Sequence, residues 1–143
     1  MIRFVSVIAA VALGATAVAA YDDVVKARQD AMKAIAGAAK EPGAALKGEA
    51  PFDLAKVHQS LAVFQEQGEQ LKSMWPDGSD KADTAALPAV WQKKDDFLAR
   101  FDKMVADAKA AAENIKDEAS FKAEWPKVMS NCGGCHKEYR KPR

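Results

Sequence analysis

The sequence predicts an all-α protein, an antiparallel four-helix bundle whose helices run up, down, up and down. Residues that favour helix (Ala, Lys, Glu, Gln, Leu and Met) dominate the chain, and β-branched residues are few. Turn-forming residues divide the region after residue 20 into four segments, within which apolar side chains recur at alternating steps of three and four. Such narrow apolar stripes are typical of helices packed nearly antiparallel, and the short connections favour a bundle.

Clusters of turn-forming residues mark the ends of the first three predicted helices. The first ends at Glu41-Pro42-Gly43, and the second ends at Trp75-Pro76-Asp77-Gly78, which a polar loop to Ala86 follows. The third begins near Pro88, a residue tolerated in the first turn of a helix, and it runs to about Ile115.

The fourth predicted helix begins between Asp117 and Ser120 and continues to Arg140. Pro126 lies inside its apolar pattern. Because proline lacks the backbone N–H, we expect a kink or a later helix start at that position.

Residues 1–20 are typical of a secretory signal peptide. Arg3 supplies the positive charge, Phe4–Leu13 is an uncharged apolar run, and Val18-Ala19-Ala20 is a cleavage signal, with Ala15-Thr16-Ala17 as a competing site. A membrane anchor is the alternative, but roughly twenty apolar residues are needed to span a bilayer. We therefore expect export and no membrane span after cleavage.

Residues 21–143 are expected to form a single domain. The chain holds 21 Lys and Arg against 20 Asp and Glu residues, so loss of Arg3 leaves 20 of each. No basic face argues for nucleic acid, and no Ser/His/Asp set, paired carboxylates or phosphate loop argues for an enzyme. A local basic cluster, which either caps the last helix or docks a partner, consists of Lys137, Arg140, Lys141 and Arg143.

The first predicted helix carries one charge on its apolar face. Arg28 shares that face with Val25, Met32 and Ile35 at helical spacing. An unpaired buried charge is costly, so Arg28 requires an anionic partner. Its own segment offers none on that face.

Both cysteines lie in the segment NCGGCH, residues 131–136. A thioredoxin-like dithiol belongs with a βαβ pattern, which is absent from the sequence. A closed zinc site needs four ligands, and Cys132, Cys135, His136 and the distant His58 are the only cysteines and histidines. A plain disulfide is possible but explains neither His136 nor Arg28.

The spacing Cys-x-x-Cys-His is the signature of c-type haem attachment. Cys132 and Cys135 can form thioethers with the two vinyl groups, and His136 can reach the iron from the same side as its proximal ligand. Gly133 and Gly134 carry no side chain that obstructs the porphyrin. The sequence therefore predicts one covalently bound haem c per chain.

From about Asp22 to Arg140 the chain resembles the class II cytochromes c, the cytochrome c prime family. The resemblance lies in KARQDAMKAIAGAAK, MWPDG, PAVW and CGGCHKEYR. It implies a four-helix bundle with haem on Cys132 and Cys135, and with His136 as the fifth iron ligand. It also supplies the anion for Arg28, namely a haem propionate.

The family contains two functional types, which differ in the sixth coordination site of the iron. In the low-spin type a first-helix methionine ligates the iron, and Met32 lies at that position; RQDAMK and KGEAPFD resemble this type more closely. In the high-spin type the site is open to nitric oxide or carbon monoxide, and Met32 would serve only in packing. His58 as a distal ligand is disfavoured, since it lies beside the apolar stripe.

We therefore expect a periplasmic monohaem cytochrome that transfers single electrons between redox partner proteins, with His/Met ligation. A high-spin gas-binding protein is the alternative. The family implies a possible homodimer through the first two helices. Trp75, Trp91, Trp125 and Tyr139 are interpreted as packing residues.

Overall fold

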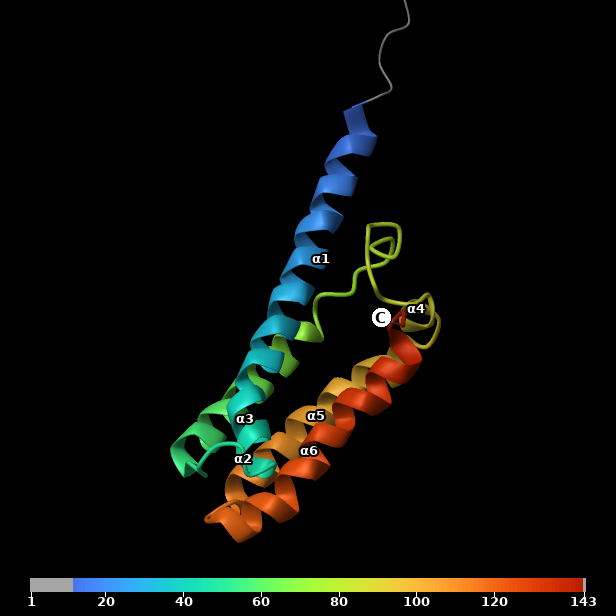
Figure 1. Ribbon diagram of the computed structural model, residues 1–143. Coiled ribbons are helices and arrows are strands. Elements are labelled where there is room, and N and C mark those ends of the chain that lie inside the picture. The colour runs from blue at the N-terminus through green and yellow to red at the C-terminus, as the bar shows by residue number, and fades with distance from the viewer. Residues whose placement is uncertain (1–11, 143) are drawn as a thin grey trace, which may run out of the picture.

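Four long helices form the body of the protein in the computed structural model, which describes residues 12–142. They are α1 (Ala12–Ala38), α3 (Leu54–Leu71), α5 (Lys94–Asn114) and α6 (Glu118–Tyr139), and two short helices, α2 (Lys40–Leu46) and α4 (Ala89–Gln92), lie in the connections. The long helices alternate in direction along the chain (Figure 1). The predicted antiparallel four-helix bundle is confirmed.

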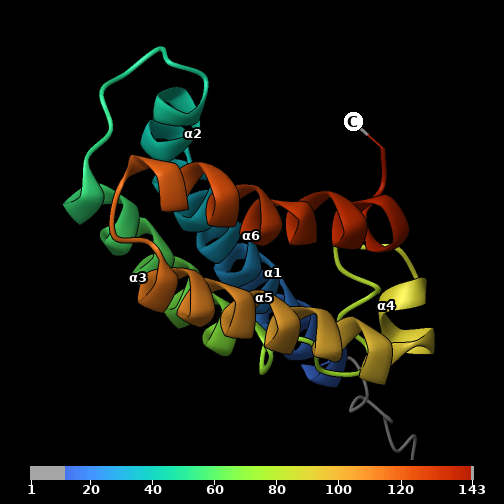
Figure 2. The same cartoon turned by 90° about the horizontal axis from the view of Figure 1, so that it is seen from below.

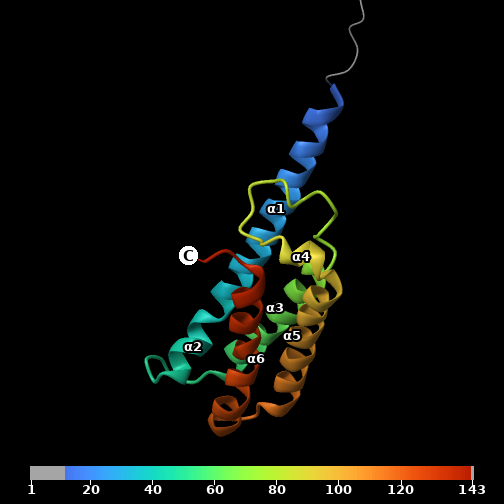
Figure 3. The ribbon, with the colours of Figure 1, turned by 90° about the vertical axis from the view of Figure 1, so that its right-hand side faces the viewer.

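The helices pack mainly as neighbours in the order α1, α3, α5, α6. Helix α3 contacts α5 most extensively, and α5–α6 and α1–α3 are the other large contacts. Among the described helices, α1 and α6 form no extensive contact, and Figure 2 shows α1 running obliquely behind α6 and α5. The N-terminal part of α1 projects beyond the other helices (Figures 1 and 3).

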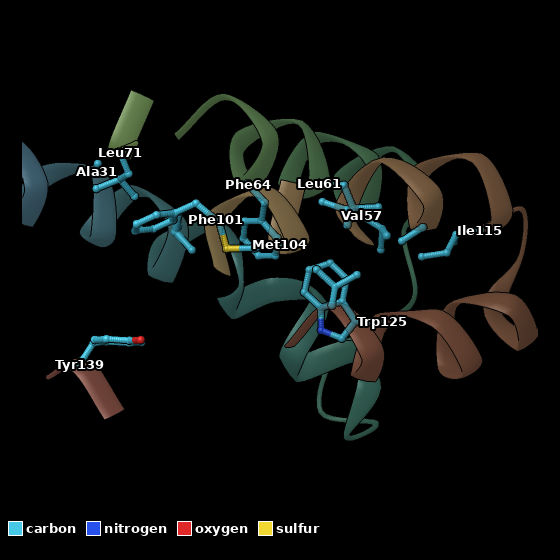
Figure 4. Packing of buried hydrophobic residues seen from close by; sticks show 14 of the residues in the cluster. Ala31, Val57, Leu61, Phe64, Leu71, Phe101, Met104, Ile115, Trp125 and Tyr139 are labelled. Atoms are coloured by element: carbon cyan, nitrogen blue, oxygen red, sulfur yellow. The ribbon is translucent and has the colours of Figure 1, made fainter. Parts of the chain in front are cut away.

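The core is formed by the predicted apolar stripes. From α3, Leu61 and Phe64 are almost completely buried, and Phe64 packs 5.6 Å from Trp125 of α6 between ring centroids. Met104 and Phe101 of α5 lie next to them (Figure 4). Complete burial of such a side chain contributes about 1.5–3 kcal/mol, so this three-helix contact stabilises the bundle.

The predicted end of the first helix at Glu41-Pro42-Gly43 is wrong. Helix α1 ends at Ala38, and Pro42 and Gly43 lie inside α2. Pro42 occupies the third position of α2, where its missing N–H is no loss because first-turn N–H groups have no helical partner.

The third predicted helix is interrupted near its start. Lys93 adopts φ −123° and ψ 44°, which separates α4 from α5. Pro88 precedes α4 directly, close to the predicted start, and Ile115 follows α5 as its C-cap.

Helix α6 begins at Glu118, where Asp117 and Ser120 form a reciprocal capping box. The later start considered for Pro126 is therefore wrong, and the helix is unbroken through this exposed residue. The capping box satisfies N–H groups at the helix start, which fixes the beginning of α6 well before the proline.

Candidate functional site

The two cysteines lie near the C-terminal end of α6, three residues apart on one face. Both are half-buried free thiols, and burial raises the pKa of each. Gly133 and Gly134 between them are exposed, and a Cβ atom added to Gly133 would meet nothing within 4 Å. The helix thus directs both thiols toward the protein, and the backbone of Gly133 and Gly134 between them is exposed to solvent.

His136 follows Cys135 directly and is half-buried. Its Nδ1 lies 3.4 Å from Nη1 of Arg140, and its carbonyl accepts a hydrogen bond of 3.3 Å from the Arg140 backbone N–H. Two half-buried thiols and an imidazole are therefore placed on little more than one helical turn. Across residues 12–142, no group of three His, Cys, Asp or Glu side chains is arranged to hold a metal ion.

A polar network, not foreseen from the sequence, fastens this turn to α5. Arg100 donates to the carbonyl of Gly134 at 3.4 Å, forms a 2.9 Å salt bridge with Glu138 and bonds Asp96 at 3.2 Å. The Tyr139 hydroxyl donates to Asp96 at 2.5 Å. The one signal in the sequence is the i, i+4 spacing of Asp96 and Arg100.

Charge and burial shift the pKa values of this network. The Tyr139 hydroxyl bond is the main cause that lowers the pKa of Asp96. Burial first, and then the Asp96 carboxylate, raises the pKa of Tyr139 to about 12. The last turn of α6 is therefore fixed by a neutral phenol that donates to a carboxylate.

The loop before α4 is tied to the end of α6. The N–H of Leu87 donates to the Tyr139 carbonyl at 2.9 Å, and the N–H of Lys141 donates to the Ala85 carbonyl at 2.8 Å. Nζ of Lys141 also donates to the Thr84 carbonyl. Lys141 thus has a structural role, while Lys137 is exposed. Arg143 of the predicted basic cluster lies outside the described residues.

The predicted inward position of Arg28 is confirmed, since only 4% of this residue is exposed. Its Nε donates to the Met74 carbonyl at 2.7 Å and its Nη2 to Oγ of Ser79 at 2.6 Å. Its Cζ lies 4.3 Å from the centroid of the Trp75 ring. Ser79 is completely buried and was not foreseen from the sequence.

These partners of Arg28 are neutral. Among residues 21–142, whose side chains the structure describes, no carboxylate forms a salt bridge with Arg28, and its buried Nη1 has no hydrogen-bond partner. Burial lowers the pKa of Arg28. A buried cation with one unused donor fits an external anion, so the requirement for an anionic partner is not met within the described part of the chain.

Met32 lies one helical turn after Arg28 on α1 and packs, half-buried, against the core. His58 lies elsewhere, with its Nε2 3.1 Å from the carbonyl oxygen of Ile115 at the far end of α5. Arg100, which contacts Gly134 in the cysteine turn (residues 132–136), is near the start of that helix. Since Arg100 and Ile115 lie 15 positions apart on α5 and a helix rises roughly 1.5 Å per residue, about 22 Å along this helix separates His58 from the cysteine turn.

The donor set fits a covalently attached haem. Cys132 and Cys135 supply two thiols on one face, and His136 supplies an imidazole next to them. Arg28 supplies a buried cation with an unused N–H, as a haem carboxylate requires.

Comparison with known proteins identifies relatives of this fold and motif. The family model described as Cytochrome C' matches residues 23–140. The chain is 40% identical to cytochrome c' of Rhodopseudomonas palustris, over 97% of this chain and 96% of that protein. It is 36% identical to cytochrome c-556 of the same organism, over 98% and 97% of the two chains.

A solved structure of cytochrome c' from Rhodopseudomonas palustris is 42% identical to the chain, with a TM-score of 0.82 over 85% of this chain and 98% of that one. Sequence and fold thus agree over nearly the whole bundle. The chain belongs to the cytochrome c' family, the class II cytochromes c, whose members carry covalently attached haem c.

Proposed function

We propose that this protein is a one-electron carrier of the periplasm. Cys132 and Cys135 would hold haem c, His136 and Met32 would ligate its iron, and Arg28 would pair with a propionate. When bound, the haem supplies an iron that alternates between two oxidation states.

The buried guanidinium of Arg28 carries this proposal. It lies on α1, held in place by Ser79 and the Met74 carbonyl, and it keeps one donor without a partner in residues 12–142. A propionate in that position would satisfy both the charge and the donor. Met32, one turn further along the same face, supports the assignment of α1 as the helix opposite the cysteine turn.

The chain's own residues prepare the site for electron transfer. Arg100 and Tyr139 fix the turn that carries the thiols and the imidazole, so little rearrangement is required when the iron changes charge. Trp75 and Phe97, 4.6 Å apart between ring centroids, cover the cluster around Arg28 and exclude water from it. Exclusion of water strengthens the interaction of Arg28 with an anion.

The alternative function is a high-spin haem protein whose open sixth site binds nitric oxide or carbon monoxide. The 40% identical relative is named cytochrome c', which favours this alternative, whereas the relatives named cytochrome c-556 favour Met32 ligation. A methionine that only packs against the core would leave the iron accessible.

Absorption spectroscopy of the purified protein separates the two functions. We expect low-spin ferric and ferrous spectra that do not change with carbon monoxide, and we expect Met32→Leu to become high-spin and to bind carbon monoxide. Met104→Leu is the matched control, since Met104 is buried against α3 near Gly68, and its spectrum should be unchanged. A wild-type spectrum that shifts readily with carbon monoxide would establish the gas-binding alternative instead.

The periplasmic location rests on the predicted signal peptide, residues 1–20, with residues 21–143 as the mature domain. Residues 1–11 lie outside the described part, and residues 12–20 are helical and continuous with α1. None of the described helices is long and apolar enough to cross a membrane. The mass of the protein isolated from its native host would locate the cleavage site, and its sedimentation would test the expected homodimer.

A further inference from the structure

Two buried hydrogen-bond donors lie side by side without partners. Nη1 of Arg28 and Nε1 of Trp75 are both inaccessible, and neither has an acceptor among the described side chains, those of residues 21–142. The two residues are 4% and 8% exposed. Because buried donors in folded proteins are almost always paired, this pair indicates an acceptor that comes from outside the polypeptide.

The two donors are close enough to share one acceptor group. Cζ of Arg28 lies 4.3 Å from the centroid of the Trp75 ring, so the guanidinium rests on the indole. A carboxylate has two oxygens and can accept from donors up to about 8 Å apart, given a hydrogen-bond length of roughly 2.9 Å on each side. One carboxylate can therefore satisfy both atoms.

The other donor atoms of this cluster each have at least one acceptor. Nε and Nη2 of Arg28 bond Met74 and Ser79, and the other nearby indole, Trp91, donates from its Nε1 to the Pro76 carbonyl at 3.2 Å. The buried donor atoms of this cluster that lack any acceptor are thus Arg28 Nη1 and Trp75 Nε1. An anion suits this place better than water, because the guanidinium charge has no counter-ion in the described residues.

We propose that Trp75 is a second ligand of the haem propionate, with its Nε1–H and Arg28 Nη1 donating to the same carboxylate. This inference rests on the proposed function, in which the haem is bound between α6 and α1. It assigns a binding role to a residue whose position in the sequence suggests only packing.

The test compares Trp75→Phe with Trp91→Phe in the haem-loaded full-length protein. Both variants keep an aromatic ring, but only Trp75→Phe removes the unpaired donor. Loss of a donor leaves more negative charge on the carboxylate near the iron, which favours the ferric state. We expect a lower reduction potential for Trp75→Phe than for Trp91→Phe, which should stay close to the wild-type potential.

A second measurement uses the wild-type protein, so it does not require any variant to fold. In the ¹⁵N-labelled reduced protein, with carbon monoxide added if the iron is high-spin, the indole N–H of Trp75 can be assigned through its contacts with the Phe97 ring. We expect its exchange with solvent to be at least tenfold slower than that of the Trp91 indole N–H, whose acceptor lies at an exposed position.

Each result supports or overturns the role of Trp75. Slow exchange together with a lowered potential supports it. Fast exchange of the Trp75 indole N–H overturns the proposal. Slow exchange together with equal reduction potentials in the two variants would mean that a water molecule is the acceptor, and this also overturns the proposal. Absence of haem from the wild-type protein is a different outcome, because it would overturn the proposed function itself.

Discussion

Arg100 of α5 forms a 2.9 Å salt bridge with Glu138 of α6, two residues after His136. The same guanidinium reaches the carbonyl of Gly134, between the two cysteines, at 3.4 Å. One side chain thus links helix α5 to the middle of the cysteine turn and to a residue shortly after it.

We expect Arg100→Gln to destabilise the haem-loaded protein by about 1 kcal/mol, because it removes several partly exposed charge-assisted bonds at once. Urea unfolding measures the change. Lys103→Gln is the control, since Lys103 also forms an i, i+4 salt bridge on α5 but contacts nothing in the cysteine turn. Equal losses in the two variants would show that Arg100 has no special role.

Gly68 of α3 lies in close contact with α5. A Cβ atom there would lie 2.7 Å from Cγ2 of Val105 and 2.9 Å from Cε of Met104. Met104 can move the end of its flexible side chain, but the stiff Val105 side chain or the helix that carries it must shift to relieve such overlap. We therefore expect Gly68→Ala to destabilise the protein by roughly 1–3 kcal/mol. Unfolding in urea measures this effect too.

Gly37 is the matched control for Gly68. It is an exposed glycine inside α1, and a Cβ atom added there meets nothing within 4 Å. Gly37→Ala should therefore stabilise the protein by roughly 0.5–1 kcal/mol through the higher helix propensity of alanine. Opposite signs at the two glycines are the expected result, and a loss at Gly37 would contradict it.

Features with a local periodic signal could be predicted from the sequence. The apolar stripe of α3 that contains Leu61 and Phe64 repeats at helical spacing, and the same spacing placed Arg28 on the buried face. Cys132, Cys135 and His136 are recognisable because attachment chemistry requires them next to one another.

The contacts that complete the site have no such signal. Ser79 meets Arg28 across 51 positions of sequence, and Glu138 meets Arg100 across 38. These pairs form only when the helices are packed, so no local pattern marks them. The predicted end of the first helix was wrong for a related reason. Pro42 was read as a helix end, but it lies in the first turn of a second helix, α2, where proline is tolerated.

Tyr139 should make stability fall in alkaline solution. Its pKa is raised from an ordinary value of 10.0 to about 12, mainly by burial and then by Asp96. The folded state therefore holds the phenolic proton more tightly than the unfolded state does. The resulting stabilisation is fully present below pH 10 and is lost as the pH rises toward about 12.

The expected measurement is the free energy of unfolding of the wild type and of Tyr139→Phe between pH 9 and 12, at about unit steps. The difference between the two proteins should shrink as the pH rises, because the variant has no phenol to titrate. A difference that is constant over this range would mean that Tyr139 ionises as readily in the folded protein as in the unfolded chain.

Ser79 determines how firmly Arg28 is held. Its hydroxyl donates to the Pro76 carbonyl at 2.7 Å and accepts from Nη2 of Arg28 at 2.6 Å, and the residue is completely buried. Ser79→Ala would leave a second nitrogen of the buried guanidinium without a partner. Since an unsatisfied buried donor costs about 1–3 kcal/mol, and more when it is charged, we expect a loss of at least about 1 kcal/mol in the free energy of unfolding.

Ser73→Ala is the control for this experiment. Ser73 is exposed, and its hydroxyl donates to the Gln70 carbonyl at 2.9 Å, so its loss should change stability by less than about 0.5 kcal/mol. Because Ser79 orients the guanidinium, Ser79→Ala should also lower the reduction potential of the haem-loaded protein, which Ser73→Ala should not do. A stability loss without any change in potential would mean that Ser79 supports the loop alone and that Arg28 keeps its position without it.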